Sequence, residues 1–410
     1  MIMDSAPGID RRNLVRWGGL AAAGVPLAAG LGHAGAAGAA PSPSWRDRLP
    51  PDTLPGGAYD RWLTRMASET GFSGVVLLAH RGRTVLSRSF GMADRERGIH
   101  NHEGIAFTLS SAGKPFNAIA VLQLAQQGRV KLGDPIGTYL TGFDPEIAEK
   151  VTVHHVLSGT SGLNTPTEDI ERVFGSRQEV HEYYEQWARR SRPVAPPGTP
   201  SQHAGAEVAI PALIVEAVSG KTYWDYVEEN IFRRCGMTGS GFFTRPQWLT
   251  DRHLAHPYMT VAGGEVDAIR NLDRGSSREH TEGRNPGRAF IDAPGDGGFA
   301  TAPDLVRFAR ALRDGTLLER PWAEVLTAAK TPHGAASFGS YGIPVRIVNG
   351  QWVFGRAGAN PGVGACWTIY PDSGWSGVIL GNADRGSLLE ATQQEMRAVT
   401  GAAPGGGSGG

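Results

Sequence analysis

One serine and one lysine, three residues apart, are the strongest candidates for chemistry in this chain. Ser111-Ala-Gly-Lys114 is its only Ser-x-x-Lys, in a sequence with just five lysines. Residues three positions apart share a helix face, so a helix starting here would bring the hydroxyl and the amine into contact. A serine beside a neutral lysine has the parts of an activated nucleophile, with the lysine as proton acceptor. The other interpretation is an ordinary helix start with an exposed lysine.

The residues after the motif predict the helix that would hold this pair. An apolar stretch runs from Ile119 to Ala125, and Gly128 and Gly133 mark its end and the next turn. Ser111 is therefore expected in the first helical turn. Free backbone N–H groups and the positive end of the helix dipole favour a developing anion at such a place.

Further motifs occur in an order that resembles a known superfamily. The chain is similar, from about residue 59 to 400, to the serine beta-lactamase, penicillin-binding protein and esterase superfamily, and in particular to its CubicO-type hydrolases. Besides Ser111 to Lys114, the matching stretches are 151–163, Pro197-Gly-Thr199, 215–223, 231–238, 297–305 and 355–362. The resemblance implies an acyl-enzyme on Ser111 with Lys114 as base.

Two elements depart from the usual motifs of this superfamily. Its Tyr-x-Asn is replaced by His203-Ala-Gly205, and its Lys-Thr-Gly or His-x-Gly by Arg356-Ala-Gly358. His203 is expected to serve as a proton relay, because a histidine changes charge near neutral pH. The alternative is a loop histidine bonded to backbone or solvent. Arg356 stays charged and suits a substrate carboxylate, or it could favour the neutral form of Lys114; a structural ion pair is the alternative.

The resemblance also implies an oxyanion hole and a substrate strand. The oxyanion hole would consist of the backbone N–H groups of Ser111 and Ala359, for which the side chains are immaterial. Substrate contacts would come from Arg356, Gly358 and Asn360.

Composition favours small-molecule substrates. Lysine plus arginine and aspartate plus glutamate both number 40, and no basic tract occurs, so neither nucleic acid nor an anionic membrane is an expected partner. The sequence has no His-Glu-x-x-His and no phosphate-binding loop, so neither a metal nor another cofactor is expected. Gly-x-Ser-x-Gly occurs only in the glycine-rich tail at 406–410 and not as a strand-to-helix elbow, which argues against an alpha/beta-hydrolase. The oligomeric state is left open.

The N-terminal segment predicts export. Arg11-Arg12 precedes a Gly/Ala-rich apolar stretch, which indicates a twin-arginine signal peptide over residues 1–39 and a periplasmic or secreted protein. The stretch is short, rich in glycine and interrupted by Pro26, so no stable membrane insertion is expected after signal removal; a retained anchor is the alternative. Residues 40–57 are then a linker, 58–400 the hydrolase domain and 401–410 a flexible tail.

The expected fold is an α+β, α/β/α sandwich with an antiparallel sheet between helices. Helices are predicted over 59–69, 208–218, 223–233 and 388–399, and strands over 74–80, 84–90 and around Val345, Val353, Cys366 and Val378. A mostly helical insertion is expected at about 115–290. Two loop-rich segments, 164–200 and 262–296, are candidate binding loops, although aromatic residues spaced like those of 164–200 more often belong to the core. Cys235 and Cys366 are expected as separate buried thiols rather than a disulfide.

Together these features predict an exported serine hydrolase acting on esters or small amides. A D-amino-acid peptidase, a beta-lactamase or an acyltransferase of the same fold is one alternative. Lactams are disfavoured because the tyrosine and the Lys-Thr-Gly element are missing. The other alternative is a catalytically impaired relative that only binds ligands.

Overall fold

An eight-stranded antiparallel sheet carries the structure. The computed structural model describes residues 49–200 and 205–401, so the predicted signal peptide, His203 and nearly all of the predicted tail lie outside the described residues. The strand order is β2-β1-β14-β13-β12-β11-β10-β9. The strands are β1 (Gly74–His80), β2 (Arg83–Phe90), β9 (Thr331–Gly334), β10 (Ser337–Gly339), β11 (Val345–Val348), β12 (Gln351–Asn360), β13 (Val363–Tyr370) and β14 (Trp375–Gly381).

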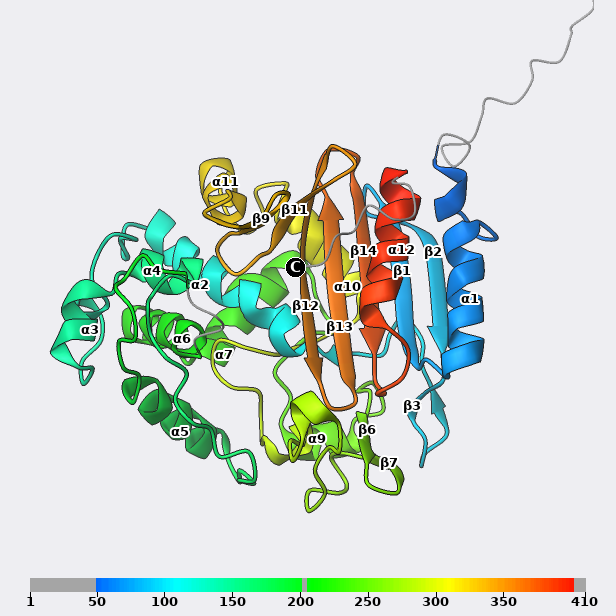
Figure 1. The fold of residues 1–410 in the computed structure, drawn as a ribbon, viewed down its shortest axis with the longest axis horizontal. Coiled ribbons are helices and arrows are strands. Elements are labelled where there is room, and N and C mark those ends of the chain that lie inside the picture. Colours follow the sequence, from blue (N-terminus) through cyan, green and yellow to red (C-terminus); the bar gives the residue numbers. More distant parts are fainter. Residues whose placement is uncertain (1–48, 201–204, 402–410) are drawn as a thin grey trace, which may run out of the picture. The chain divides into compact units, whose positions relative to one another are not determined.

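Helices cover both faces of this sheet (Figure 1). The N-terminal helix α1 (Ala58–Thr70) and the C-terminal helix α12 (Leu388–Thr400) pack together on one face. Tyr59, Leu63 and Met66 recur every three or four residues on the buried side of α1, which explains why this stretch forms an amphipathic helix. The opposite face is covered by α10 (Ala302–Ala311), and the larger hydrophobic core continues from there into the helical region.

The helical region lies between β2 and β9 in sequence. Its helices are α2 (Lys114–Gln126), α3 (Pro145–Lys150), α4 (Val153–Ser158), α5 (Arg177–Arg189), α6 (Ala206–Ser219), α7 (Tyr223–Val227), α8 (Arg233–Cys235), α9 (Arg245–Thr250) and, after α10, α11 (Arg320–Thr327). The first of these, α2, is buried on nearly all sides and contacts α6. No helix in the described part of the chain is long and apolar enough to cross a membrane.

Short elements connect these layers. Small two-stranded sheets pair β3 (Met92–Asp94) with β4 (Ile99–His100), β5 (Phe107–Thr108) with β8 (Phe299–Ala300), and β6 (Tyr258–Val261) with β7 (Gly264–Asp267). The β5–β8 pair matters for the site, because it places the start of α2 beside the segment that precedes Phe299.

A buried carboxyl group lies between the sheet and α12. Glu395 of α12 accepts hydrogen bonds from the hydroxyls of Thr368 and Tyr370 on β13. Burial raises the pKa of Glu395 to about 7, while the two hydroxyl hydrogen bonds act in the opposite direction. This carboxyl is therefore expected to stay protonated well above the ordinary range of a glutamate.

The predicted α+β sandwich is confirmed, with several local corrections. The segment 164–200 is not only loop, because α5 occupies its middle, and the stretch 223–233 is interrupted by a π-helical segment at Glu228–Phe232. Beyond α9 the predicted helical insertion contains the β6–β7 hairpin rather than further α-helix. The end of the predicted linker forms a 3-10 turn, Pro51–Thr53, whose Thr53 is buried. Cys235 and Cys366 are both free thiols, as expected, but only Cys366 is buried and Cys235 is half-buried.

Candidate active site

The candidate nucleophile lies in a tight turn just before α2. Ser111 belongs to a 3-10 turn, Ser110–Gly113, and α2 begins only at Lys114, so the predicted first α-helical turn is a 3-10 turn instead. Ser110 has a φ of 47°, in the left-handed region that residues with a side chain rarely occupy. Strain of this kind persists only where surrounding contacts hold it.

Two side chains from the sheet hold the turn. The Trp367 indole N–H donates to the carbonyl of Ala112 at 2.9 Å, and the Arg356 Nε donates to the carbonyl of Ser111 at 3.1 Å. Trp367 is buried and Arg356 is half-buried, and water replaces a hydrogen bond poorly at such positions. The nucleophile turn is thereby fixed to β12 and β13.

The predicted pair is in contact. The Nζ of Lys114 donates to the Oγ of Ser111 and also forms an ion pair with Asp296, with 2.8 Å between Nζ and Oδ2. Asp296 precedes β8, and Gly297 donates its N–H to Asp296 Oδ1 at 2.8 Å. The site thus contains a serine, a lysine and a carboxylate connected in a row.

Glycines allow the backbones around this row to approach closely. A Cβ at Gly113 would lie 1.8 Å from the carbonyl oxygen of Gly297, and one at Gly358 would lie 2.2 Å from the carbonyl oxygen of Leu109 and 2.7 Å from the nitrogen of Ser111. Any side chain at either position would push these segments apart. Gly358, a predicted substrate-contact residue, therefore sets the distance between β12 and the nucleophile turn.

The orientation of Ala359 suits the predicted oxyanion hole. Its carbonyl accepts a hydrogen bond from the Ser110 hydroxyl at 3.1 Å, so this carbonyl points from β12 toward the nucleophile turn. The N–H and C=O of one strand residue point to the same edge, so the Ala359 N–H is directed there as well. A carbonyl oxygen bound beside Ser111 could then receive N–H groups from both residues.

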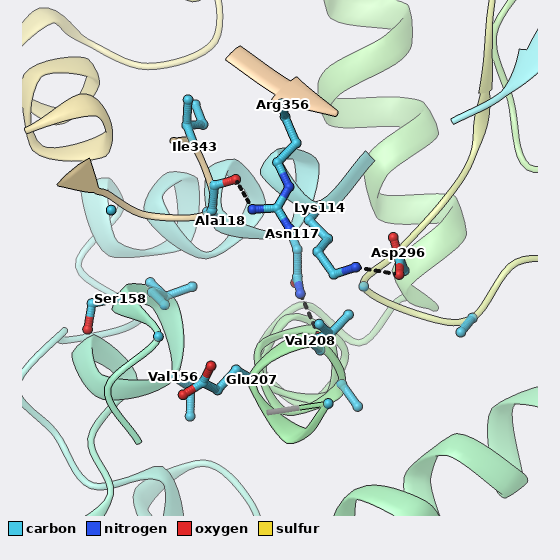
Figure 2. A pocket seen from close by; sticks show the side chains of 18 of the residues that line it. Lys114, Asn117, Ala118, Val156, Ser158, Glu207, Val208, Asp296, Ile343 and Arg356 are labelled. Carbon is cyan, nitrogen blue, oxygen red and sulfur yellow. Dashed lines mark hydrogen bonds and ion pairs between the residues drawn. The ribbon is translucent and has the colours of Figure 1, made fainter. Parts of the chain in front are cut away.

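A cavity of about 410 Å³ opens beside Lys114. Lys114 and Asn117 of α2, Asp296 of the loop before β8 and Arg356 of β12 line this cavity together (Figure 2). The walls are both apolar and polar, and they include Ala118, Val156, Leu157, Glu168, Tyr184, Trp187, Glu207, Val208, His333 and Ile343. The apolar share of the lining suits a small acyl group.

Arg356 is directed inward but is already engaged. Besides the carbonyl of Ser111, its guanidinium contacts the carbonyl of Gly342 at 3.4 Å. Burial lowers the pKa of Arg356, and the charge of Asp296 partly offsets this effect. The third predicted contact residue, Asn360, lies exposed at the end of β12, paired with Val363.

A second carboxyl group supports the loop that carries Asp296. Asp292 Oδ2 accepts the N–H of Gly298 at 2.8 Å. Burial raises the pKa of Asp292 to about 7, the hydrogen bond from Gly298 lowers it, and the neighbouring charge of Asp296 raises it. Asp292 is thus a carboxyl that takes up a proton more easily than an ordinary aspartate.

The predicted proton relay, His203, lies outside the described residues, so that prediction is untested. Gly205, at the asparagine position of the resemblance, is described, and a Cβ there would lie 1.9 Å from the ring of Trp187. The indole of Trp187 therefore takes the space into which an asparagine side chain would extend.

Sequence reasoning missed Asp296 as a site residue. Its only local signal is its position directly before the recognised stretch 297–305. Lys114 and Asp296 are 182 residues apart, and no spacing rule relates them.

The fold and the site together define a beta-lactamase-like hydrolase architecture, with the serine-lysine turn between an antiparallel sheet and a helical region. Comparison with known families agrees: the Beta-lactamase family model matches residues 59–400. The chain belongs to this family.

Individual relatives span several activities. Esterase EstB of Burkholderia gladioli is 40% identical over 93 residues, which are 22% of this chain and 24% of that protein. A penicillin-binding protein of Bacillus halodurans has a similar structure, with a TM-score of 0.69, 24% identity and coverage of 82% of this chain and 98% of that one. The D-amino acid amidase of Ochrobactrum anthropi SV3 has a TM-score of 0.67 at 18% identity, covering 84% and 98%. The chain spans less than two thirds of the length of the curated relatives it matches.

Proposed function

We propose that this protein is an exported serine hydrolase that forms an acyl-enzyme on Ser111 and acts on esters or small amides. The observation that carries the proposal is the contact between the Ser111 hydroxyl and the Lys114 amine at the edge of a cavity. Family membership alone gives the fold, whereas this contact supports the chemistry.

The acylation step follows from the positions of the groups. Ser111 Oγ attacks the substrate carbonyl carbon while its proton passes to neutral Lys114, and the N–H groups of Ser111 and Ala359 stabilise the oxyanion. Lys114 then returns the proton to the leaving alcohol or amine. Water attacks the acyl-enzyme in the second half of the reaction and releases the acid.

Two features favour esters and small amides as substrates: the hydrogen bonds that Arg356 already makes within the protein, and the lining of the cavity. Arg356 bonds to two backbone carbonyls, so less of its guanidinium remains for a substrate carboxylate. A cavity of about 410 Å³ with partly apolar walls accommodates a small acyl group. The esterase and amidase among the relatives favour the same two substrate classes.

A ligand-binding protein without turnover is the second candidate, and one observation favours it. The Nζ of Lys114 is already paired with the carboxylate of Asp296, so the nitrogen that would have to accept the serine proton is engaged with another group. A direct test of acylation separates the two candidates.

That test is intact-mass measurement after incubation with a fluorophosphonate, which reacts with activated serines. The protein is expected to gain one adduct, which peptide mapping places on Ser111 and which is absent from heat-denatured protein and from the Ser111→Ala variant. If folded parent protein forms no adduct at any pH between about 6 and 10, or if the variant keeps it, the proposed mechanism is wrong.

The export part of the proposal rests on the twin arginines of the sequence. We expect a precursor that carries both Arg11→Lys and Arg12→Lys to stay in the cytoplasm, while the parent is recovered outside it. Equal recovery of both outside the cytoplasm would contradict twin-arginine export.

A further inference from the structure

Two walls of the cavity come from segments far apart in the sequence. The first, which we call the sheet wall, is residues 339–344, at the end of β10 and before β11. The second, the helix wall, is residues 156–159, at the end of α4. Figure 2 shows Ile343 of the sheet wall together with Val156 and Ser158 of the helix wall. The distance between these two walls therefore limits the size of the group that the cavity can hold.

The sheet wall lies close to the nucleophile. The carbonyl of Gly342 accepts a hydrogen bond from Arg356, whose Nε also holds the carbonyl of Ser111. A Cβ at Gly342 would lie 3.6 Å from the carbonyl oxygen of Lys114, so the sheet wall borders the start of α2. A displacement of the sheet wall would thus change the cavity at the place where an acyl group must bind to reach Ser111.

One hydrogen bond joins the two walls from behind. The hydroxyl of Tyr341 lies 2.6 Å from Nδ1 of His154 in α4, and the two rings meet edge to face. Neither side chain is among the described residues that line the cavity. Both have close ties to residues that do, because Tyr341 lies between Ser340 and Gly342 in sequence, and the carbonyl of His154 accepts the hydroxyl of Ser158 at 2.7 Å. The bond therefore fixes one wall relative to the other from outside the cavity.

Other contacts hold Tyr341 rigidly. Its side chain is buried, and its N–H donates to the carbonyl of Leu326 in α11 at 3.3 Å. The Nζ of Lys330 lies 3.9 Å from the centre of the Tyr341 ring and donates to the carbonyls of Val325 and Ala328. A buried hydroxyl needs a hydrogen-bond partner, and here the partner is on α4. The ring thus gives α4 a fixed point of attachment.

We propose that Tyr341 and His154 are positioning residues whose hydrogen bond holds the two walls together and thereby excludes bulky acyl groups from the cavity. The inference rests on the proposed function, because it concerns which acyl groups reach Ser111. With the bond in place, the cavity of about 410 Å³ keeps its shape and admits small acyl groups. Without the bond, the sheet wall separates more easily from α4, and an aromatic acyl group gains access.

The test compares the hydrolysis of 4-nitrophenyl acetate with that of 4-nitrophenyl phenylacetate. Tyr341→Phe removes the hydroxyl and keeps the ring. We expect the ratio of kcat/KM for the phenylacetate to kcat/KM for the acetate to rise about fivefold in this variant, mainly through a lower KM for the phenylacetate. Labelling by a fluorophosphonate is measured alongside, because it reports on the reactivity of Ser111 independently of acyl size.

Variants of His154 test the same bond from the other wall. His154→Leu removes the ring nitrogen and should raise the ratio to a similar extent. His154→Asn, whose amide can take the place of Nδ1, should keep the ratio of the parent. The double variant Tyr341→Phe, His154→Leu should shift the ratio no further than either single variant, because each change removes the same bond. A general loss of stability would not produce this pattern.

Tyr258→Phe is the comparison for loss of a buried tyrosine hydroxyl elsewhere. Tyr258 is also buried, and its hydroxyl accepts the N–H of Arg95. Its variant should keep the parent ratio. Thermal melts establish that each variant is folded, and the His154 variants decide if Tyr341→Phe does not fold.

Two results would overturn the inference and leave the Ser111 mechanism intact. One is an unchanged ratio in the folded variants that lack the bond, and the other is an equal rise in Tyr258→Phe. Absence of both ester hydrolysis and Ser111 labelling in the parent protein overturns the proposed function, and the inference with it.

Discussion

Replacing Gly358 by alanine tests whether the spacing between β12 and the nucleophile turn controls acylation. The added Cβ would lie 2.2 Å from the carbonyl oxygen of Leu109, 2.5 Å from the nitrogen of Ala112 and 2.7 Å from the nitrogen of Ser111. All three neighbours are backbone atoms, so no flexible side chain can move aside. One of the two segments must shift by roughly an ångström to restore ordinary contact.

The expected loss follows from the oxyanion donors. A shift of this size lengthens the distance from the Ala359 N–H to an oxyanion held at Ser111. Removing one such donor costs about 10² to 10³ in rate, or about 3–4 kcal/mol of transition-state stabilisation. Overpacking also lowers the free energy of unfolding by about 1–3 kcal/mol. The variant should therefore fold, but acylate about a hundredfold more slowly or worse.

Gly364 offers a matched control on the neighbouring strand. It pairs with Ala359, and a Cβ there would meet only Leu388 Cδ2 at 3.9 Å, an ordinary van der Waals distance. The comparison is of kinact/KI for a fluorophosphonate in the parent, Gly358→Ala and Gly364→Ala, together with thermal melts. A folded Gly358→Ala that labels within about threefold of the parent would refute the assigned role of this spacing.

Two further predictions concern the buried Glu395 and the half-buried Arg356. The pKa of Glu395 rises from the ordinary 4.5 in the unfolded chain to about 7 in the folded protein. As the pH rises from 4.5 to 7, the unfolded chain loses this proton first, so the free energy of unfolding falls by about 3 kcal/mol in total. In urea titrations Glu395→Gln should lack this fall, and equal pH dependence in variant and parent would contradict the assignment. Arg356→Ala should slow acylation by neutral and by carboxylate-bearing esters to a similar extent, because the guanidinium holds the carbonyl of Ser111. A loss confined to carboxylate-bearing esters would instead assign Arg356 to substrate binding.

The sequence predicts those elements whose signal is local. The spacing of buried residues in α1, the alternation and turn around β1 and β2, and the apolar run of α2 all lie within short windows, and the structure has these elements within a few residues of the predicted bounds. The contact between Ser111 and Lys114 is predictable for the same reason, since it depends only on spacing within one turn.

Features that depend on tertiary contact cannot be predicted this way. Asp296 reaches Lys114 only because β5 pairs with β8, and nothing in the residues around either group indicates that pairing. The α5 helix escapes prediction because its flanking segments are rich in proline and glycine, although its own residues form an amphipathic pattern with Trp187 on the buried side. Tertiary packing also explains why Gly205 stands in place of an asparagine, through the ring of Trp187.

The pairing of β1 with β14 has a consequence for the stage of synthesis at which the active site can form. Strand β1 follows the first helix, yet its partner β14 ends only at Gly381. Ala359, which bonds to the hydroxyl of Ser110, also belongs to the last quarter of the chain. During synthesis the serine and lysine emerge about 250 residues before Ala359 (residues 111 and 359). An incomplete chain therefore carries a serine with no oxyanion donor from β12, and the nucleophile is assembled only when nearly all of the polypeptide is available to fold.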